Sequence, residues 1–288
     1  MVELVIGSEI ASLKNRLGPP RRTVHISARR GDPRRRLFTF SGARCEGAVT
    51  AGSYFAMTDF VLIHGAWHGS WCWARVRRLL AEAGHRVFTP TLTGLGERSH
   101  LLSRDVGLDT HIADVANLMI WEELHDVVLV GHSYGGAIAR HVADTLRDRI
   151  RSLVYLDAFV PENGKCLFDY QADNGKTQRE LAVAHGEGWK VPPIPASFFA
   201  VNSADAGWVD SQCTMHPLST FEAPARLSGA CDEVANIGYI VARGFEGPFD
   251  QFHVRAGERG WWREELACGH DVMLDMPDEL TALLLERT

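Results

Sequence analysis

Apolar and polar positions follow two different rhythms along the chain after residue 57. Continuous apolar runs are typical of strands buried on both faces of a sheet, and such segments predict strands at 60–63, 86–89, 127–130 and 151–157. Segments in which apolar residues recur every three or four positions predict helices at 71–83, 109–123 and 136–146. This repeated strand–helix order predicts an α/β fold with a mostly parallel sheet flanked by helices.

The rhythm stops between residues 162 and 235 and then resumes. This stretch contains Pro192-Pro193-Ile194-Pro195 and many large apolar side chains, which predicts an inserted cap over the functional edge of the sheet. We expect most of these side chains to form the cap's own small core and a few to face a pocket. Further strands are expected at 239–243 and 261–266, and further helices at 248–259 and 277–286.

Residues 1–56 differ from the rest of the chain in composition. They hold ten Lys or Arg residues against four Asp or Glu, and they show little periodicity. We interpret them as a disordered or non-native basic extension, and we place the functional domain at 57–288. The four acidic residues disfavour an organelle transit peptide, which is poor in Asp and Glu.

The composition of the whole chain excludes several functional classes. Its 288 residues carry a net charge of −6, which argues against nucleic acid as a partner. No apolar run is long enough to span a membrane, so no membrane contact is expected. The six cysteines are scattered without a C-x-x-C pair, which predicts reduced thiols in a cytoplasmic protein and neither disulfides nor a metal site. A homodimer is left open.

A candidate nucleophile lies in Gly131-His132-Ser133-Tyr134-Gly135, between the strand at 127–130 and the helix at 136–146. A strand that passes directly into a helix makes a sharp turn, and small residues two positions before and after its tip let the two elements approach. Ser133 is then expected at the tip, with its hydroxyl exposed at the edge of the sheet. A turn serine that only caps the helix is the alternative.

A serine needs a base and a site for the oxyanion before it can attack a carbonyl. His270 is the histidine that follows the last predicted strand, so we expect it to be the base. The N–H groups of Tyr134 and of Ala66, in the loop after the first strand, are expected to form the oxyanion hole. The flanking residues Gly65, Trp67 and His132 are expected to contact the substrate.

Three segments resemble one family closely. They are 60–73 (Phe-Val-Leu-Ile-His-Gly-Ala-Trp-His-Gly-Ser-Trp-Cys-Trp), 131–136 (Gly-His-Ser-Tyr-Gly-Gly) and 269–274 (Gly-His-Asp-Val-Met-Leu). Together they are similar to the α/β-hydrolase superfamily, in particular to the branch of plant methylesterases, plant hydroxynitrile lyases and small bacterial carboxylesterases. The resemblance covers about 57–288. It implies a capped, six-stranded parallel sheet and no cofactor.

The third member of the catalytic triad stays open at this stage. The family pattern places an acid shortly after the strand that follows the cap, where this chain has Glu246, and Asp250 is a weaker candidate in the next helix. A different arrangement in the superfamily uses an acid after the strand that follows the nucleophile helix, which here is Asp157. Glu246 is favoured. Asp157 is the main alternative, and it could instead be a structural residue that binds nearby backbone amides.

The resemblance implies a serine carboxylesterase that hydrolyses a small, hydrophobic or aromatic ester through an acyl-enzyme. An amidase or carbamate hydrolase with the same triad and a non-catalytic ligand receptor are the alternatives. The lyases of this branch carry a threonine where this chain has Gly65 and a lysine where it has Asp271. A lysine can neutralise departing cyanide, whereas an aspartate would repel it, so hydroxynitrile lyase activity is disfavoured.

Overall fold

The structure is a computed structural model that describes residues 57–288. The basic extension inferred for residues 1–56 lies outside the described residues. The described part contains a six-stranded parallel sheet with the strand order β2-β1-β3-β4-β7-β8. Its strands are β1 (Asp59–Ile63), β2 (Arg86–Phe88), β3 (Val127–His132), β4 (Ile150–Leu156), β7 (Asn236–Ala242) and β8 (Trp262–Leu266). The predicted α/β architecture is confirmed.

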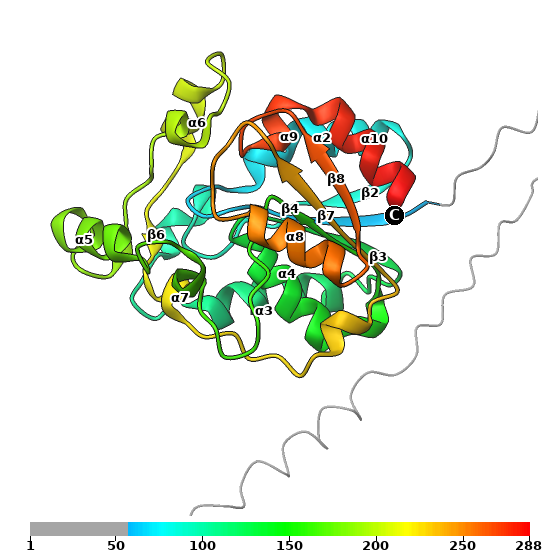
Figure 1. The fold of residues 1–288 in the computed structure, drawn as a ribbon, viewed down its shortest axis with the longest axis horizontal. Helices are drawn as coiled ribbons and strands as arrows, with labels where there is room; N and C mark the ends of the chain where they lie inside the picture. The colour runs from blue at the N-terminus through cyan, green and yellow to red at the C-terminus, as the bar shows by residue number, and fades with distance from the viewer. Residues whose placement is uncertain (1–56) are drawn as a thin grey trace, which may run out of the picture. The chain divides into compact units, whose positions relative to one another are not determined.

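Helices cover both faces of the sheet (Figure 1). One face packs against α3 (Leu108–Trp121), α4 (Gly135–Leu146) and α8 (Asp250–Glu258). The other face packs against α2 (Ala74–Glu82), α9 (Val272–Asp275) and α10 (Pro277–Arg287). Side chains of a strand point alternately to its two faces, so Val61 and Ile63 belong to the first core while Phe60 and Leu62 belong to the second. The central strands therefore carry apolar side chains on both faces.

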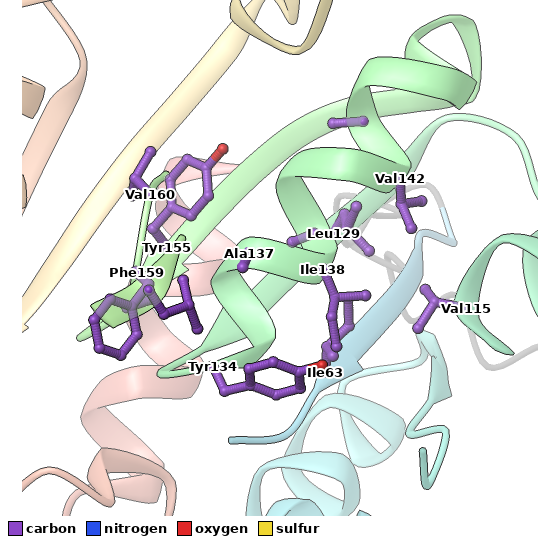
Figure 2. Packing of buried hydrophobic residues seen from close by; sticks show 14 of the residues in the cluster. Ile63, Val115, Leu129, Tyr134, Ala137, Ile138, Val142, Tyr155, Phe159 and Val160 are labelled. Carbon is purple, nitrogen blue, oxygen red and sulfur yellow. The ribbon is translucent and has the colours of Figure 1, made fainter. Parts of the chain in front are cut away.

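Helix α4 lies directly against the sheet next to the turn at Ser133. Figure 2 shows Ala137, Ile138 and Val142 on this helix, packed with Ile63 of β1 and Leu129 of β3. The approach depends on glycine. A Cβ at position 131 would lie 2.5 Å from the carbonyl oxygen of Gly135, and a Cβ at position 136 would lie 2.5 Å from that of Phe159. The glycine spacing seen in the sequence is therefore required sterically.

The segment between β4 and β7 forms the inserted part of the fold. It contains α5 (Lys176–His185), α6 (Ala206–Gln212), α7 (Ser219–Glu222) and a small antiparallel pair, β5 (Lys190–Val191) with β6 (His216–Pro217). In Figure 1, α5 and α6 stand away from the sheet and its flanking helices. The large sheet resumes at Asn236. Phe168 and Phe221 stack on each other and belong to the buried core, so part of the cap's aromatic content is structural.

Three further observations bear on the sequence predictions. The helix expected at 71–83 is divided into a 3-10 turn at Ser70–Trp73 and the α-helix α2. Five of the cysteines are described and are free, namely Cys72, Cys166, Cys213, Cys231 and Cys268. None of the helices between residues 57 and 288 combines the length and apolar composition needed to cross a membrane.

Candidate active site

Ser133 occupies the sharp turn between β3 and α4. Its backbone φ is +53°, in the left-handed region that a non-glycine residue rarely adopts. Such a conformation costs about 1–3 kcal/mol and persists where the surroundings enforce it. Here the Ser133 N–H donates to the carbonyl of Leu156, and the Ser133 carbonyl accepts from the N–H of Phe159. The strained turn is thus held on both sides by β4 and the loop that follows it.

His270 lies on the loop between β8 and α9, and its partner is Asp157. The Nδ1–H of His270 donates to Asp157 Oδ2 at 2.6 Å. The other carboxylate oxygen of Asp157 accepts from the N–H of Ala242 at 3.1 Å, and both side chains are buried. Because Nδ1 carries the proton, Nε2 of His270 is free to accept one. This is the tautomer that a base for a serine hydroxyl requires.

The structure corrects the predicted pairing of His270 with Glu246. Glu246 is exposed at the rim of the pocket, and the single N–H of His270 Nδ1 is already used by Asp157. Asp250 is exposed and pairs with Arg243 at 2.5 Å. The reason lies in the sheet, where Asp157 follows β4 directly, with φ +41°, and so turns its carboxylate toward the loop after β8. Asp157 also binds a nearby backbone amide, that of Ala242, which is the structural role considered as its alternative.

Aromatic rings surround the imidazole of His270. Phe249 stacks on it with centroids 4.9 Å apart, and Phe199 of the cap stacks at 5.4 Å. The backbone N–H of His270 also donates to the carbonyl of Phe199. The bond to Asp157 and these flanking rings fix the plane of the imidazole, and they connect the position of His270 to the cap.

The loop after β1 carries the first expected oxyanion donor. Ala66 and Tyr134 line the pocket beside Ser133, so the structure brings together the residues whose N–H groups were predicted to act. Tyr134 precedes the first residue of α4, and the first N–H groups of a helix have no partner within the helix. The positive end of the helix dipole points to the same place, which suits a developing negative charge.

Histidines hold the successive peptide groups of this loop. His64 Nδ1 donates to the carbonyl of Gly65 at 2.8 Å, and His68 Nδ1 donates to that of Ala66 at 2.7 Å. The N–H of Trp67 donates to Nδ1 of His216 in the cap, at 3.3 Å. Trp67 itself has φ +64°. The loop is therefore a clamped structure whose peptide orientations are set by three imidazole rings.

Two of these histidines are neutral. The Nε2 of His64 accepts from the N–H of Leu92, and burial lowers the pKa of His64 to about 3. His216 donates from Nε2 to Thr220 Oγ1, and burial lowers its pKa well below 6.5. A neutral ring accepts at one nitrogen and donates at the other, as the hydrogen bonds here require.

His68 and Asp271 form a second buried pair that the sequence reasoning missed. His68 Nε2 lies 3.0 Å from Asp271 Oδ2, and the side chains are 5% and 0% exposed. One pattern in the sequence could have indicated it. Asp271 interrupts an otherwise apolar stretch directly after His270, and a charged residue there needs a buried partner. Asp271 does not line the pocket. The expectation that its carboxylate would repel departing cyanide therefore does not hold.

A pocket of about 980 Å³ opens onto Ser133 and His270. Its walls come from the loops at the sheet edge and from the cap, and they include Trp67, Phe159, Phe198, Phe199, Phe221, Phe245 and Phe249. Carboxylates of Asp169, Asp173 and Glu246 line it too, and none of its lining residues is Lys or Arg. The pocket thus suits a neutral, largely aromatic molecule.

The three expected substrate contacts divide between two spaces. Trp67 lines the large pocket and also borders the small cavity beside Ser133. Gly65 and His132 instead line a cavity of about 10 Å³ beside Ser133 and His270. A Cβ at Gly65 would lie 3.0 Å from both His132 Nδ1 and Ser133 Cβ. Gly65 therefore keeps the space next to the nucleophile open, while His132 donates from Nε2 to the carbonyl of His270.

Comparisons with known proteins agree with this geometry. Residues 60–283 match the family described as the alpha/beta hydrolase family. The chain is 44% identical to a carbendazim hydrolyzing esterase from Nocardioides sp. (strain SG-4G), over 79% of this chain and 98% of that protein. It is 36% identical to Methylesterase 2 of Arabidopsis thaliana over 36% of this chain and 40% of that protein.

Solved structures show the same fold. An extracellular alpha/beta-hydrolase from a Paenibacillus species superimposes with a TM-score of 0.71 at 24% identity, covering 80% of this chain and 98% of that one. A pyrethroid hydrolase from Sphingobium faniae JZ-2 gives 0.63 at 23% identity, covering 80% and 96%. The relatives support a hydrolase of the esterase type. The chain belongs to the α/β-hydrolase family.

Proposed function

We propose that the protein is a serine carboxylesterase for small, hydrophobic or aromatic esters. The observation that carries the proposal is the 2.6 Å hydrogen bond between His270 and Asp157, which sits beside a serine in a strained strand-to-helix turn. An imidazole held in one tautomer by a buried carboxylate is the arrangement that activates a serine hydroxyl. The pair next to this serine is therefore interpreted as the base and the acid of a catalytic triad.

In the proposed reaction, Ser133 attacks the ester carbonyl while His270 Nε2 takes the hydroxyl proton. Asp157 stabilises the imidazolium that forms, and the N–H groups of Ala66 and Tyr134 bind the oxyanion. His270 then returns the proton to the leaving alcohol, which yields the acyl-enzyme. A water molecule activated by the same histidine releases the acid and restores the serine. Besides the substrate and this water molecule, the proposed cycle uses side chains and backbone groups of the chain.

The shape and composition of the pocket support the substrate class. The large aromatic pocket extends under the cap and suits one large apolar half of a substrate. Gly65 lines a much smaller cavity of about 10 Å³ beside Ser133, which has room for about one water-sized group. An ester with a bulky aromatic half would place that half in the large pocket.

Carbamate hydrolysis with the same triad is the second candidate, because a carbamate presents the same carbonyl to Ser133. The 44% identical relative named as a carbendazim hydrolyzing esterase favours including carbamates and carbendazim itself among the test substrates. A hydroxynitrile lyase is disfavoured because no lysine or arginine lines the pocket to neutralise cyanide.

The proposal is tested by active-site variants on a panel of p-nitrophenyl esters, carbamates and anilides. We expect ester hydrolysis by the wild-type protein and its loss in Ser133→Ala and His270→Ala, to about 10⁻⁴ of the original kcat or less. A fluorophosphonate should label Ser133. Near-normal turnover in either variant would refute the mechanism. A single burst of product without continued release would indicate a ligand receptor, the remaining alternative.

A further inference from the structure

The His68–Asp271 pair joins the two loops that the proposed chemistry must keep in register. His68 belongs to the loop after β1, which carries Ala66. Asp271 follows His270 in the chain, and its own carbonyl accepts the first hydrogen bonds of α9, from Leu274 and Asp275. The contact between Nε2 of His68 and Oδ2 of Asp271, 3.0 Å long, is therefore a direct link between the oxyanion loop and the histidine loop.

The hydrogen bonds of His68 show that it is an imidazolium. Its Nδ1 faces the carbonyl oxygen of Ala66 at 2.7 Å, and its Nε2 faces the carboxylate of Asp271. The carbonyl can only accept, and the lowered pKa of Asp271 keeps that group an accepting carboxylate, so both ring nitrogens carry a hydrogen. Burial by itself lowers the pKa of His68, but the Asp271 carboxylate outweighs it and raises the pKa well above 6.5. The histidines around Asp271, His68 foremost, keep the pKa of Asp271 below its usual range although burial opposes this.

Within residues 57–288, Asp271 is the carboxylate that faces His68. Trp71 stacks on its ring at 4.9 Å, and the thiol of Cys213 lies 4.0 Å from Nδ1. The other titratable groups that face the pair are the thiol of Cys72 and the imidazoles of His64, His132, His216 and His270. His132 approaches Asp271 Oδ1 only to 3.9 Å, because its Nε2–H is directed at the carbonyl of His270.

The pair is poorly designed for stability alone. Asp271 Oδ1 is buried without a hydrogen-bond partner. Taking two charges out of water costs more than such an incomplete set of hydrogen bonds returns, and apolar side chains of similar volume would fill the space at lower cost. What the ion pair adds is orientation, since a charged bond with Nδ1 fixed on the Ala66 carbonyl allows few arrangements of either loop.

We propose that His68 and Asp271 are a positioning pair that holds the Ala66 peptide at a fixed distance from His270, so that oxyanion binding and proton transfer occur in one geometry. The inference rests on the proposed esterase function. Asp271 lines neither the large pocket nor the small cavity beside Ser133, and His68 lines only the small cavity. The pair acts through Ala66 on one side and through the His270 backbone on the other. Loss of this register weakens transition-state binding and leaves ground-state binding of the ester nearly unchanged.

The test compares Asp271→Asn, His68→Gln and the double variant His68→Gln/Asp271→Asn. Arg86→Gln is the matched control, because it breaks the ion pair of Arg86 with Asp59. Both residues lie at the first positions of their strands, away from the strand ends that carry the candidate site. For each protein we would measure kcat and KM with a p-nitrophenyl ester, Ki for phenylboronic acid and the thermal midpoint. Phenylboronic acid forms a tetrahedral adduct with the serine, so its Ki reports the oxyanion site and the base together.

We expect kcat to fall by about 10- to 100-fold in each single variant, with KM changed by less than about threefold and the Ki of phenylboronic acid raised by the same factor as kcat falls. The single variants should be less stable, because each leaves one buried group without its partner. The double variant should regain thermal stability, because it buries no charge, but its kcat and Ki should stay impaired. Arg86→Gln should keep both at wild-type values.

Three results would overturn the positioning role. The first two are a double variant that recovers kcat together with stability and a double variant that fails to fold, since a purely structural pair accounts for either. The third is a change confined to KM. A wild-type protein that hydrolyses no ester and is not labelled by a fluorophosphonate would overturn the proposed function itself. If the wild type is labelled, but the variants are labelled equally fast, the proposed function stands and the positioning role fails.

Discussion

His270 Nδ1 lies 2.6 Å from Asp157 Oδ2, although the two residues follow strands that are not neighbours in the sheet. Strand β7 lies between β4 and β8, and its last residue, Ala242, donates its N–H to the other carboxylate oxygen of Asp157. The carboxylate thus bridges the end of β7 to reach the histidine. Both of its oxygens are satisfied and the group is buried, which makes it a fixed support for one tautomer of the imidazole.

Replacing Asp157 by asparagine should reduce kcat by about 10⁴-fold, because the amide would favour the wrong tautomer of His270. Glu246→Gln is the matched control. It changes an exposed carboxylate of similar chemistry, and we expect kcat within about threefold of the wild type, as for other exposed substitutions. Steady-state kinetics with one p-nitrophenyl ester decides between the two. A large loss in Glu246→Gln with a normal Asp157→Asn would show that the acid changes partner during the reaction.

The charge of the pocket should select among substrates. Asp169, Asp173 and Glu246 line it without any Lys or Arg, so a substrate that carries a carboxylate meets only like charge. We expect the kcat/KM of an aryl ester to fall by about tenfold when a neutral ring substituent is exchanged for a carboxylate, and the difference to shrink in high salt. Glu246→Gln should reduce the discrimination. Equal rates for the neutral and anionic esters would contradict this prediction.

Gly136→Ala should destabilise the protein by about 3 kcal/mol, the upper part of the usual range for overpacking. The added methyl group would lie 2.5 Å from the carbonyl oxygen of Phe159, which cannot retreat without moving the Ser133 turn. Gly207→Ala in α6 is the control, because a Cβ there meets nothing within 4 Å. We expect it to stabilise the fold slightly, by about 0.5 kcal/mol. Urea unfolding of both variants provides the measurement.

Stability should fall steeply as the pH drops from about 6.5 to 5. Burial lowers the pKa of His64 to about 3 and of His111 to about 4, and it holds those of His132 and His216 well below 6.5. The unfolded chain takes up protons at these histidines near pH 6.5, whereas the folded protein does not. Each of these histidines therefore lowers the free energy of unfolding by up to about 1.4 kcal/mol for every pH unit below about 6.5.

His68 should not add to this slope, because its pKa is raised and it is protonated in both states below pH 6.5. The measurement is the free energy of unfolding in urea at several pH values. His111→Gln is the informative variant, since an amide can still donate to Thr93 and accept from Tyr134, as His111 does. His111→Gln should reduce the slope of the free energy of unfolding against pH by the amount that one histidine contributes. A flat profile between pH 5 and 6.5 would show that the buried histidines are protonated in the folded protein.

Local patterns determined much of the fold and of the site. The apolar runs and helical spacing predicted the parallel sheet and the helices on both faces, because each element has to bury one or two faces regardless of its neighbours. The glycines around Ser133 predicted the turn for a similar reason. The steric demand at position 131 arises within one strand–turn–helix unit, whereas the demand at position 136 comes from Phe159 in the loop after β4. The loop with Ala66 and the position of His270 after the last strand also follow from chain order alone.

Only the tertiary structure decided which acid supports His270 and how the loops are held. Glu246 and Asp157 both follow strands at the same edge of the sheet, so sequence position could not distinguish them, and the choice came from the backbone turn at Asp157 and the N–H of Ala242. His68 and Asp271 are 203 positions apart in the chain. A contact between such distant residues depends on how separate elements pack, and no local propensity encodes it. The sequence thus determined the turn at Ser133 and the candidate nucleophile on it, whereas packing determined the partners that orient the groups around it.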